Sequence, residues 1–132
     1  MTYLLDTGPL VGLLDRNDPW HAWCVETLQH LSPPFHTCEA VLAEASHFFE
    51  RMDAVCTLLD SGEVSLNFDA KDEMDRLCQL MGKYEQMSFA DASIVRMAEI
   101  QRGSIVWTLD RRDFSRYRIR RNEPVPFLAP EP

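Results

Sequence analysis

One carboxylate in this chain lies where an amphipathic helix should be apolar. Residues 88–98 have helical periodicity, and the apolar residues three, four and seven positions after Asp91 place that acid on the buried face. An unpaired carboxylate costs several kcal/mol to bury. A helix N-terminus returns only about 0.3–1 kcal/mol of that cost. A cation shared with other carboxylates would offset it, so other acids should lie near Asp91.

Three other acids occupy positions from which they could meet Asp91. Asp6 and Asp110 each follow a short apolar run that we interpret as a buried strand, and Glu44 lies at the edge of the apolar arc of a predicted helix. In parallel α/β sheets, ligands bind beyond the carboxyl ends of the strands. We therefore expect the four acids to converge at one edge of a sheet.

A cluster of this kind predicts metal-dependent chemistry. Carboxylates that repel one another are tolerated when a divalent cation binds them, and oxygen ligands select Mg²⁺ or Mn²⁺. Such a cation can polarise a phosphodiester and activate water, which is the chemistry of a nuclease. Taken singly, Asp6 is more commonly a turn residue and Glu44 a surface acid, and Asp110 could be a plain N-cap. The metal site is favoured by the combination of these acids with Asp91.

Short apolar strands that alternate with helices predict an α/β fold with a mainly parallel sheet. The helix of Asp91 should begin after the N-cap Ser88, a capping-box variant with Asp in place of Glu. We expect strands at 3–6, 35–37, 64–68, 104–109 and 117–120, and helices at 9–15, 19–31, 38–51, 53–60, 70–81 and 89–101, with Asp18 and Asp69 as N-caps and Gly62, Gly82 and Gly103 as stops.

Helical spacing also predicts which side chains face the core. The expected inward residues are Trp20, Trp23, Cys24, Leu28 and Leu31 in the second helix, Val41, Leu42, Ala45, Phe48 and Phe49 in the third, and Met74, Leu77, Cys78 and Met81 in the helix at 70–81.

The composition is that of one soluble globular domain, residues 1–132, with 45% apolar and 26% charged residues. We expect a cytoplasmic protein, because the N-terminus has no basic region of a signal peptide and no run is long enough to span a membrane. The four cysteines form no C-x-x-C motif and should be free thiols. The tail at 123–132 has four prolines and should be extended.

The net charge of −8 argues against a nucleic-acid partner, but the charge is uneven. Residues 111–121 hold six arginines and one acid, Asp113, directly after Asp110. A solvated loop is the simpler interpretation of this segment taken alone. Beside an acidic metal site, Arg111, Arg112 and Arg116 become candidates for contacts with RNA phosphates.

Four segments, in order, resemble the PIN-domain ribonucleases, in particular the VapC-type toxins of toxin–antitoxin pairs: Leu4–Thr7, Val41–Ala45, Ala90–Ile94 and Thr108–Phe114. The resemblance implies a three-layer α/β/α sandwich with a flavodoxin-like sheet. It implies Mg²⁺ or Mn²⁺ held by Asp6 and Asp91, with Glu44 and Asp110 completing the catalytic set. Asp113 is the alternative to Asp110 and otherwise supports it, and Thr7 and Thr108 are candidate supporting hydroxyls.

The same resemblance implies RNA cleavage, an antitoxin protein that blocks the site, and a homodimer. Two other functions stay open. A catalytically silent PIN-like domain would bind RNA or a partner without turnover. A phosphatase or receiver-type domain would use a strand-end aspartate, but a phosphatase would also want an acid two residues after Asp6, where the chain has Gly8.

Overall fold

Five short parallel strands form the central sheet, in the order β3-β2-β1-β4-β7. The computed structural model describes residues 1–132. Because the strands are all parallel, their carboxyl ends lie at the same edge of the sheet. The strands are β1 (Tyr3–Leu5), β2 (Phe35–Thr37), β3 (Val64–Leu66), β4 (Ile105–Trp107) and β7 (Phe127–Leu128).

The central strand β1 places the N-terminal segment directly beside β4. Leu5 is in register with Trp107 of β4, and the Asp6 amide donates to the Trp107 carbonyl at 3.0 Å. Leu4 and Leu5 are almost fully buried, which explains the apolar run at this position. The residues that directly follow β1 and β4 are thereby placed side by side at the carboxyl edge.

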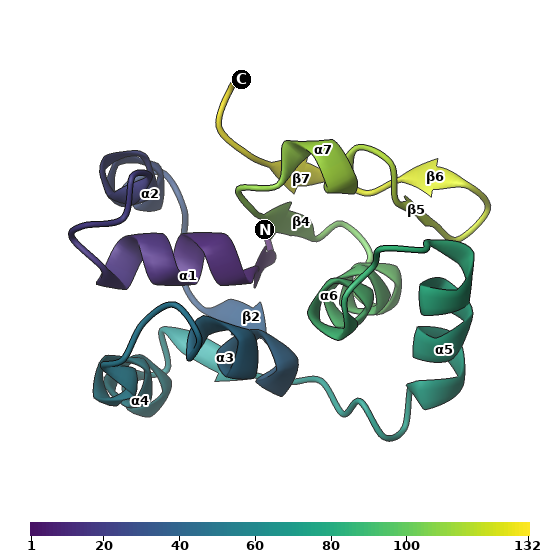
Figure 1. Ribbon diagram of the computed structural model, residues 1–132, viewed down its shortest axis with the longest axis horizontal. Coiled ribbons are helices and arrows are strands. Elements are labelled where there is room, and N and C mark those ends of the chain that lie inside the picture. The colour runs from purple at the N-terminus through teal and green to yellow at the C-terminus, as the bar shows by residue number, and fades with distance from the viewer.

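Seven helices surround the sheet, and α6 lies in its middle region against β1 and β4 (Figure 1). Helix α3 contacts both α1 and α6, and α5 packs on the outer side of α6. The helices are α1 (Thr7–Leu14), α2 (His21–Leu28), α3 (Glu39–Ala45), α4 (Met52–Ser61), α5 (Met74–Lys83), α6 (Phe89–Ile100) and α7 (Arg111–Phe114). The predicted α/β class with a parallel sheet is confirmed. None of the helices combines the length and the apolar character that crossing a bilayer requires.

The tail takes part in the sheet, which the expectation of a merely extended segment missed. After the antiparallel pair β5 (Arg118–Ile119) and β6 (Glu123–Pro124), the chain adds β7 beside β4. The Arg111 guanidinium donates to the carbonyls of Pro130 and Ala129, at 3.2 and 2.9 Å. This strand is only two residues long and lies at a sheet edge, where prolines are tolerated. The proline-rich segment therefore gave no sign of it.

The helix of Asp91 follows its local sequence signals closely. Ser88 caps α6 by accepting a hydrogen bond from the Asp91 amide at 3.0 Å, as the capping-box pattern predicts. Gly62 and Gly103 have the positive φ angles, 83° and 81°, of helix-terminating glycines. Local capping chemistry therefore determines where α4 and α6 end.

The prediction of one helix over 38–51 was wrong. Helix α3 ends at Ala45, where the Ser46 hydroxyl donates back to the Ala43 carbonyl. The next amides, of His47 and Phe48, donate to carbonyls three residues earlier, so the chain tightens into turns. As a result the Phe48 side chain is 66% exposed and not part of the core.

Two other helix starts were predicted too early. The Asp18 carboxylate accepts from the Trp20 amide and the Asp69 carboxylate from the Lys71 amide, so each acid stabilises a local turn ahead of its helix. Trp20, predicted to face the core, directly precedes α2 and is 42% exposed.

The predicted inward face of α5 also needs correction. Leu77 and Leu80 are its buried residues, whereas Met74 and Cys78 are exposed, and Gly82 lies within the helix. All four cysteines are free, and Cys24 and Cys38 are buried.

Candidate metal centre

Asp6 begins the site as a buried acid between β1 and α1. It occupies the N-cap position of α1, yet its carboxylate does not cap the helix. One carboxylate oxygen, Oδ2, instead accepts a hydrogen bond of 2.6 Å from the Thr108 hydroxyl. The same hydroxyl accepts from the Asp110 amide at 3.0 Å. Thr108 therefore links the ends of β1 and β4, which explains why a hydroxyl follows the apolar run of β4.

Asp91 enters from α6, on the side of the helix that faces the sheet edge. Its carboxylate is partly buried and its Oδ2 accepts a hydrogen bond of 2.7 Å from the Tyr117 hydroxyl. Ile94, Val95 and Ala98, which form the predicted apolar stripe, are buried. The acid is thus fixed on the core side of the helix, where its charge faces other acids.

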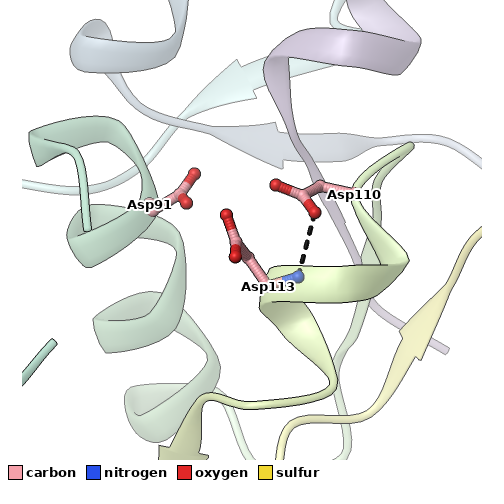
Figure 2. Close-up of side chains that lie close together, drawn as sticks. All are labelled: Asp91, Asp110 and Asp113. Atoms are coloured by element: carbon pink, nitrogen blue, oxygen red, sulfur yellow. Dashed lines mark hydrogen bonds between the residues drawn. The ribbon is translucent and has the colours of Figure 1, made fainter. Parts of the chain in front are cut away.

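Asp110 and Asp113 lie opposite Asp91 on the short helix α7. Asp110 is the N-cap of this helix, and its Oδ1 accepts from the Asp113 amide at 2.9 Å. Figure 2 shows the three carboxylates pointing into one space. One oxygen of each of Asp91, Asp110 and Asp113 lies within 4.8 Å of the others. Both acids of the ambiguous last motif therefore lie beside Asp91.

A cavity of about 580 Å³ at the carboxyl edge joins these acids to the others. All four predicted catalytic acids line it, and the loop between α1 and α2 adds two more. The carboxylates on its wall are Asp6, Asp15, Asp18, Glu44, Asp91 and Asp110. Asp6 is not a member of the close group of three, but it shares this wall with Asp91 and Asp110.

The electrostatics show that the carboxylates repel one another. Burial, with the charge of Asp91 next in importance, raises the pKa of Asp6 to about 7. Burial also raises the pKa of Asp91 to about 6, with contributions from Asp110 and Glu44, although the Tyr117 hydrogen bond opposes the shift. The pKa of Asp110 is raised as well, mainly by burial. Several negative charges in one cavity therefore lack compensation.

The residues of the cavity fit a divalent cation. No lysine, arginine or histidine lines it, and the nearby charge of Arg112 does not reverse the rise in the pKa of Asp110. The Thr7 hydroxyl is buried on the same wall and has no hydrogen-bond partner. An unpartnered buried hydroxyl beside clustered carboxylates is a suitable oxygen donor for a hard cation or for a water bound to it. The donor set is therefore compatible with Mg²⁺ or Mn²⁺.

The predicted arginines take different positions around the site. None of Arg111, Arg112 and Arg116 lines the cavity. Arg111 is engaged with the tail carbonyls, and Arg116 lies 3.4 Å from an Asp113 oxygen. Arg112 on α7 and Arg116, two residues after it, are both exposed and therefore accessible to a polyanion.

Two features of the site escaped the sequence reasoning. Tyr117 was assigned to a weak strand, and no pattern paired it with Asp91, 26 residues earlier. Asp15 was placed at a helix end and Asp18 at a helix start, with no reason to connect them to Asp6. The sequence did offer one signal for these two acids: they lie three residues apart, directly after α1.

Gly8 holds the first turn of α1 against the loop that carries Asp110. A Cβ atom at this position would lie 2.8 Å from Cγ of Leu109, closer than side chains approach in proteins. We expect Gly8→Ala to displace Leu109 and to lower the free energy of unfolding by about 1–3 kcal/mol. Chemical denaturation measures this loss, and Gly82→Ala, at a helix position with open space, is the matched control. Equal stability of the two variants would contradict the close packing.

Comparison with known families agrees with the geometry. The PIN domain family model matches residues 3–119, which include all of the acids at the site. No curated protein matches the chain. A match over nearly the full length, with the acidic cluster at the carboxyl edge of a parallel sheet, establishes that the chain belongs to the PIN domain family.

Proposed function

We propose that this protein is a metal-dependent endoribonuclease. The observation that carries the proposal is a cavity lined by six carboxylates and no basic side chain. Such a wall attracts a divalent cation. Members of the PIN domain family are generally metal-dependent nucleases. The intact set of four acids favours catalysis over the alternative, a silent domain that binds RNA or a partner.

Each side chain of the site has its own role in the proposed reaction. A divalent cation, when bound, supplies polarisation of the phosphodiester and a more acidic water. Asp6 and Asp91 would hold this cation, and Glu44 and Asp110 would complete the set or orient the attacking water. Thr108 holds Asp6 and the start of α7 in place through its hydroxyl. Thr7 offers its unpartnered hydroxyl, and Asp113 supports Asp110 through the turn of α7.

RNA is the proposed substrate because the motif segments resemble those of ribonucleases, and the surface next to the acids offers two exposed arginines for its phosphates. Arg112 lies on α7 and Arg116 two residues after this helix, which also carries Asp110 as its cap. Guanidinium groups there would bind phosphates on either side of the cleaved bond and offset the repulsion from an acidic body. Arg111 has its guanidinium on the tail carbonyls, so its role in this scheme is to fix α7.

We further propose that the protein is the toxin of a type II toxin–antitoxin pair, of the VapC type. The support is the resemblance of the four motif segments, of which Thr108–Phe114 is the longest. In this proposal the protein acts in the cytoplasm, forms a homodimer, and is blocked by a cognate antitoxin. A reading frame for a small DNA-binding protein beside the gene would support it.

The nuclease proposal is tested with purified protein and total cellular RNA. We expect cleavage with Mg²⁺ or Mn²⁺, none in EDTA, and recovery when the cation is restored. Binding of RNA without cleavage under either cation would instead favour the silent domain. The toxin role is tested separately by induced expression, which should arrest growth. Growth at the normal rate, with the protein present and active on RNA in vitro, would overturn the toxin role alone.

A further inference from the structure

Tyr117 lies behind the acid cluster, and its hydroxyl reaches into it. The side chain is only 3% exposed, and its hydroxyl donates to Oδ2 of Asp91 at 2.7 Å. The bond joins the segment after α7 to helix α6, across 26 residues of chain. A buried tyrosine hydroxyl commonly finds such a partner, so the question is what this particular bond does for the site.

Two aromatic rings fix the position of the hydroxyl. The Tyr117 ring makes T-shaped contacts with Tyr84 and Phe114, at centroid distances of 5.1 and 5.2 Å. Phe114 belongs to α7 and is fully buried. The Tyr84 hydroxyl accepts from the Arg118 amide at 2.9 Å, which holds the backbone directly after Tyr117. The Tyr117 hydroxyl is therefore a preorganised donor, with little freedom to move away from Asp91.

The function of the Tyr117 hydroxyl follows from the atom that accepts its hydrogen bond. The bond goes to Oδ2 of Asp91, and the carboxylate points toward Asp110 and Asp113 (Figure 2). The carboxylate group of an aspartate can rotate about its Cβ–Cγ bond. A hydroxyl fixed on one oxygen stops that rotation and leaves the other oxygen, Oδ1, for the interior of the cluster.

We propose that Tyr117 is a positioning residue that orients the Asp91 carboxylate so that one oxygen takes the hydroxyl and the other takes the divalent cation. This inference rests on the proposed nuclease function, because it assigns Asp91 a cation. Partners that orient metal-binding carboxylates typically change metal affinity or activity by about 10–100-fold when they are removed. Tyr117 would also connect the position of α7, through Phe114, to the orientation of the acid on α6.

The test is a titration of Mn²⁺ against the wild-type protein and two variants, with free Mn²⁺ followed by electron paramagnetic resonance. Tyr117→Phe keeps the ring and both T-shaped contacts but removes the hydroxyl. Tyr3→Phe is the control, because it also removes a tyrosine hydroxyl, from a ring that packs on Phe35 and has no bond to Asp91 or to the segment of Tyr117. We expect the Mn²⁺ dissociation constant to rise about tenfold in Tyr117→Phe and to stay within about twofold of wild type in Tyr3→Phe.

RNA cleavage supplies a second readout of the same variants. In Tyr117→Phe the Mn²⁺ concentration for half-maximal rate should rise by the same factor as the dissociation constant, with kcat at saturating Mn²⁺ close to wild type. Wild-type affinity in Tyr117→Phe overturns the inference. So does an equal loss in both variants, because the hydroxyls would then act only on the fold.

The outcomes separate this inference from the proposed function. If the wild-type protein itself binds no Mn²⁺, the nuclease proposal fails. If it binds Mn²⁺ and Tyr117→Phe binds equally well, only the role of Tyr117 fails.

A measurement on the wild-type protein applies even if Tyr117→Phe does not fold. The hydroxyl proton of Tyr117, observed by nuclear magnetic resonance, should remain protected from exchange and shift when Mg²⁺ is added. Loss of that signal on Mg²⁺ binding would mean that the cation displaces the hydroxyl, which overturns the inference.

Discussion

The Asp91→Asn variant is expected to lose RNA cleavage by about three orders of magnitude or more while the protein remains folded. An amide is a poor ligand for a hard cation compared with a carboxylate, and Asp91, like Asp110, belongs both to the group within 4.8 Å and to the cavity of Asp6. The fold should survive, because the Asn carbonyl can still accept from the Tyr117 hydroxyl. Single-turnover cleavage of a labelled RNA, together with thermal unfolding, measures both properties.

A matched variant controls for the loss of a helix acid as such. Asp75 occupies the first turn of α5, as Asp91 occupies the first turn of α6, but it is exposed and does not line the cavity. Asp75→Asn should therefore cleave RNA at the wild-type rate. Cation-dependent cleavage retained by Asp91→Asn in a preparation free of other nucleases would falsify the assignment of the site.

The second large effect concerns the stability of the cation-free protein as a function of pH. The folded pKa of Asp6, about 7, lies above its usual value of 3.8. The folded state therefore favours the protonated acid, and this contribution is fully present below pH 4 and is lost as the pH rises through about 7. We expect the free energy of unfolding in EDTA to fall by on the order of 4 kcal/mol between pH 4 and pH 7.5.

Two other groups define the limits of this window. Asp91, with a pKa raised to about 6, acts in the same direction and shares part of the effect with Asp6 because the two acids interact. Glu99, whose pKa is lowered by hydrogen bonds from Arg76 and the Arg120 amide despite its burial, acts oppositely at more acidic pH. The fall in stability should therefore be seen between pH 4 and pH 7.5, and not below.

Urea denaturation at half-unit steps of pH measures the slope of stability against pH, and a cation should reduce this slope. Mn²⁺ or Mg²⁺ at about 100 times its dissociation constant would restore roughly 2.7 kcal/mol at pH 7.5. Asp6→Asn is the control, because its side chain can still accept from Thr108 but cannot ionise. A stability that rises between pH 4 and pH 7.5 without a cation, in wild type, would contradict the buried acid pair.

Much of the site could be predicted because its residues break local rules. The helical periodicity of α6 shows that one acid lies in its apolar stripe. The ends of the apolar runs of β1 and β4 show the two acids that follow these strands. The parallel sheet then brings them together without further information. Thr7 and Thr108 could be named for the same reason. Thr7 directly follows Asp6, and Thr108 lies two residues before Asp110.

The features that escaped prediction depend on contacts between distant segments. The Tyr117 hydrogen bond to Asp91 has no periodicity, and the acids of the α1–α2 loop approach the cavity only through packing of that loop. The boundary of α3 was missed for a different reason. Its apolar pattern continues through Phe48 and Phe49, but the Ser46 hydroxyl bonds to the Ala43 carbonyl and local hydrogen bonding outweighs the pattern. The two-residue strand β7 is below the length at which alternation can be detected.

The hydrogen bond between Thr108 and Asp6 has a consequence for the nascent chain. The two residues are 102 positions apart, and the strand that precedes Thr108 lies directly beside the strand that precedes Asp6. During synthesis the ribosome makes Asp6 first, and at about 5–20 residues per second the partner strand follows many seconds later. Until β4 leaves the ribosome, β1 lacks one neighbour and Asp6 has no hydroxyl to hold it. The cavity cannot form in a partly synthesised chain, so an incomplete copy of a nuclease would carry its first acid but no assembled site.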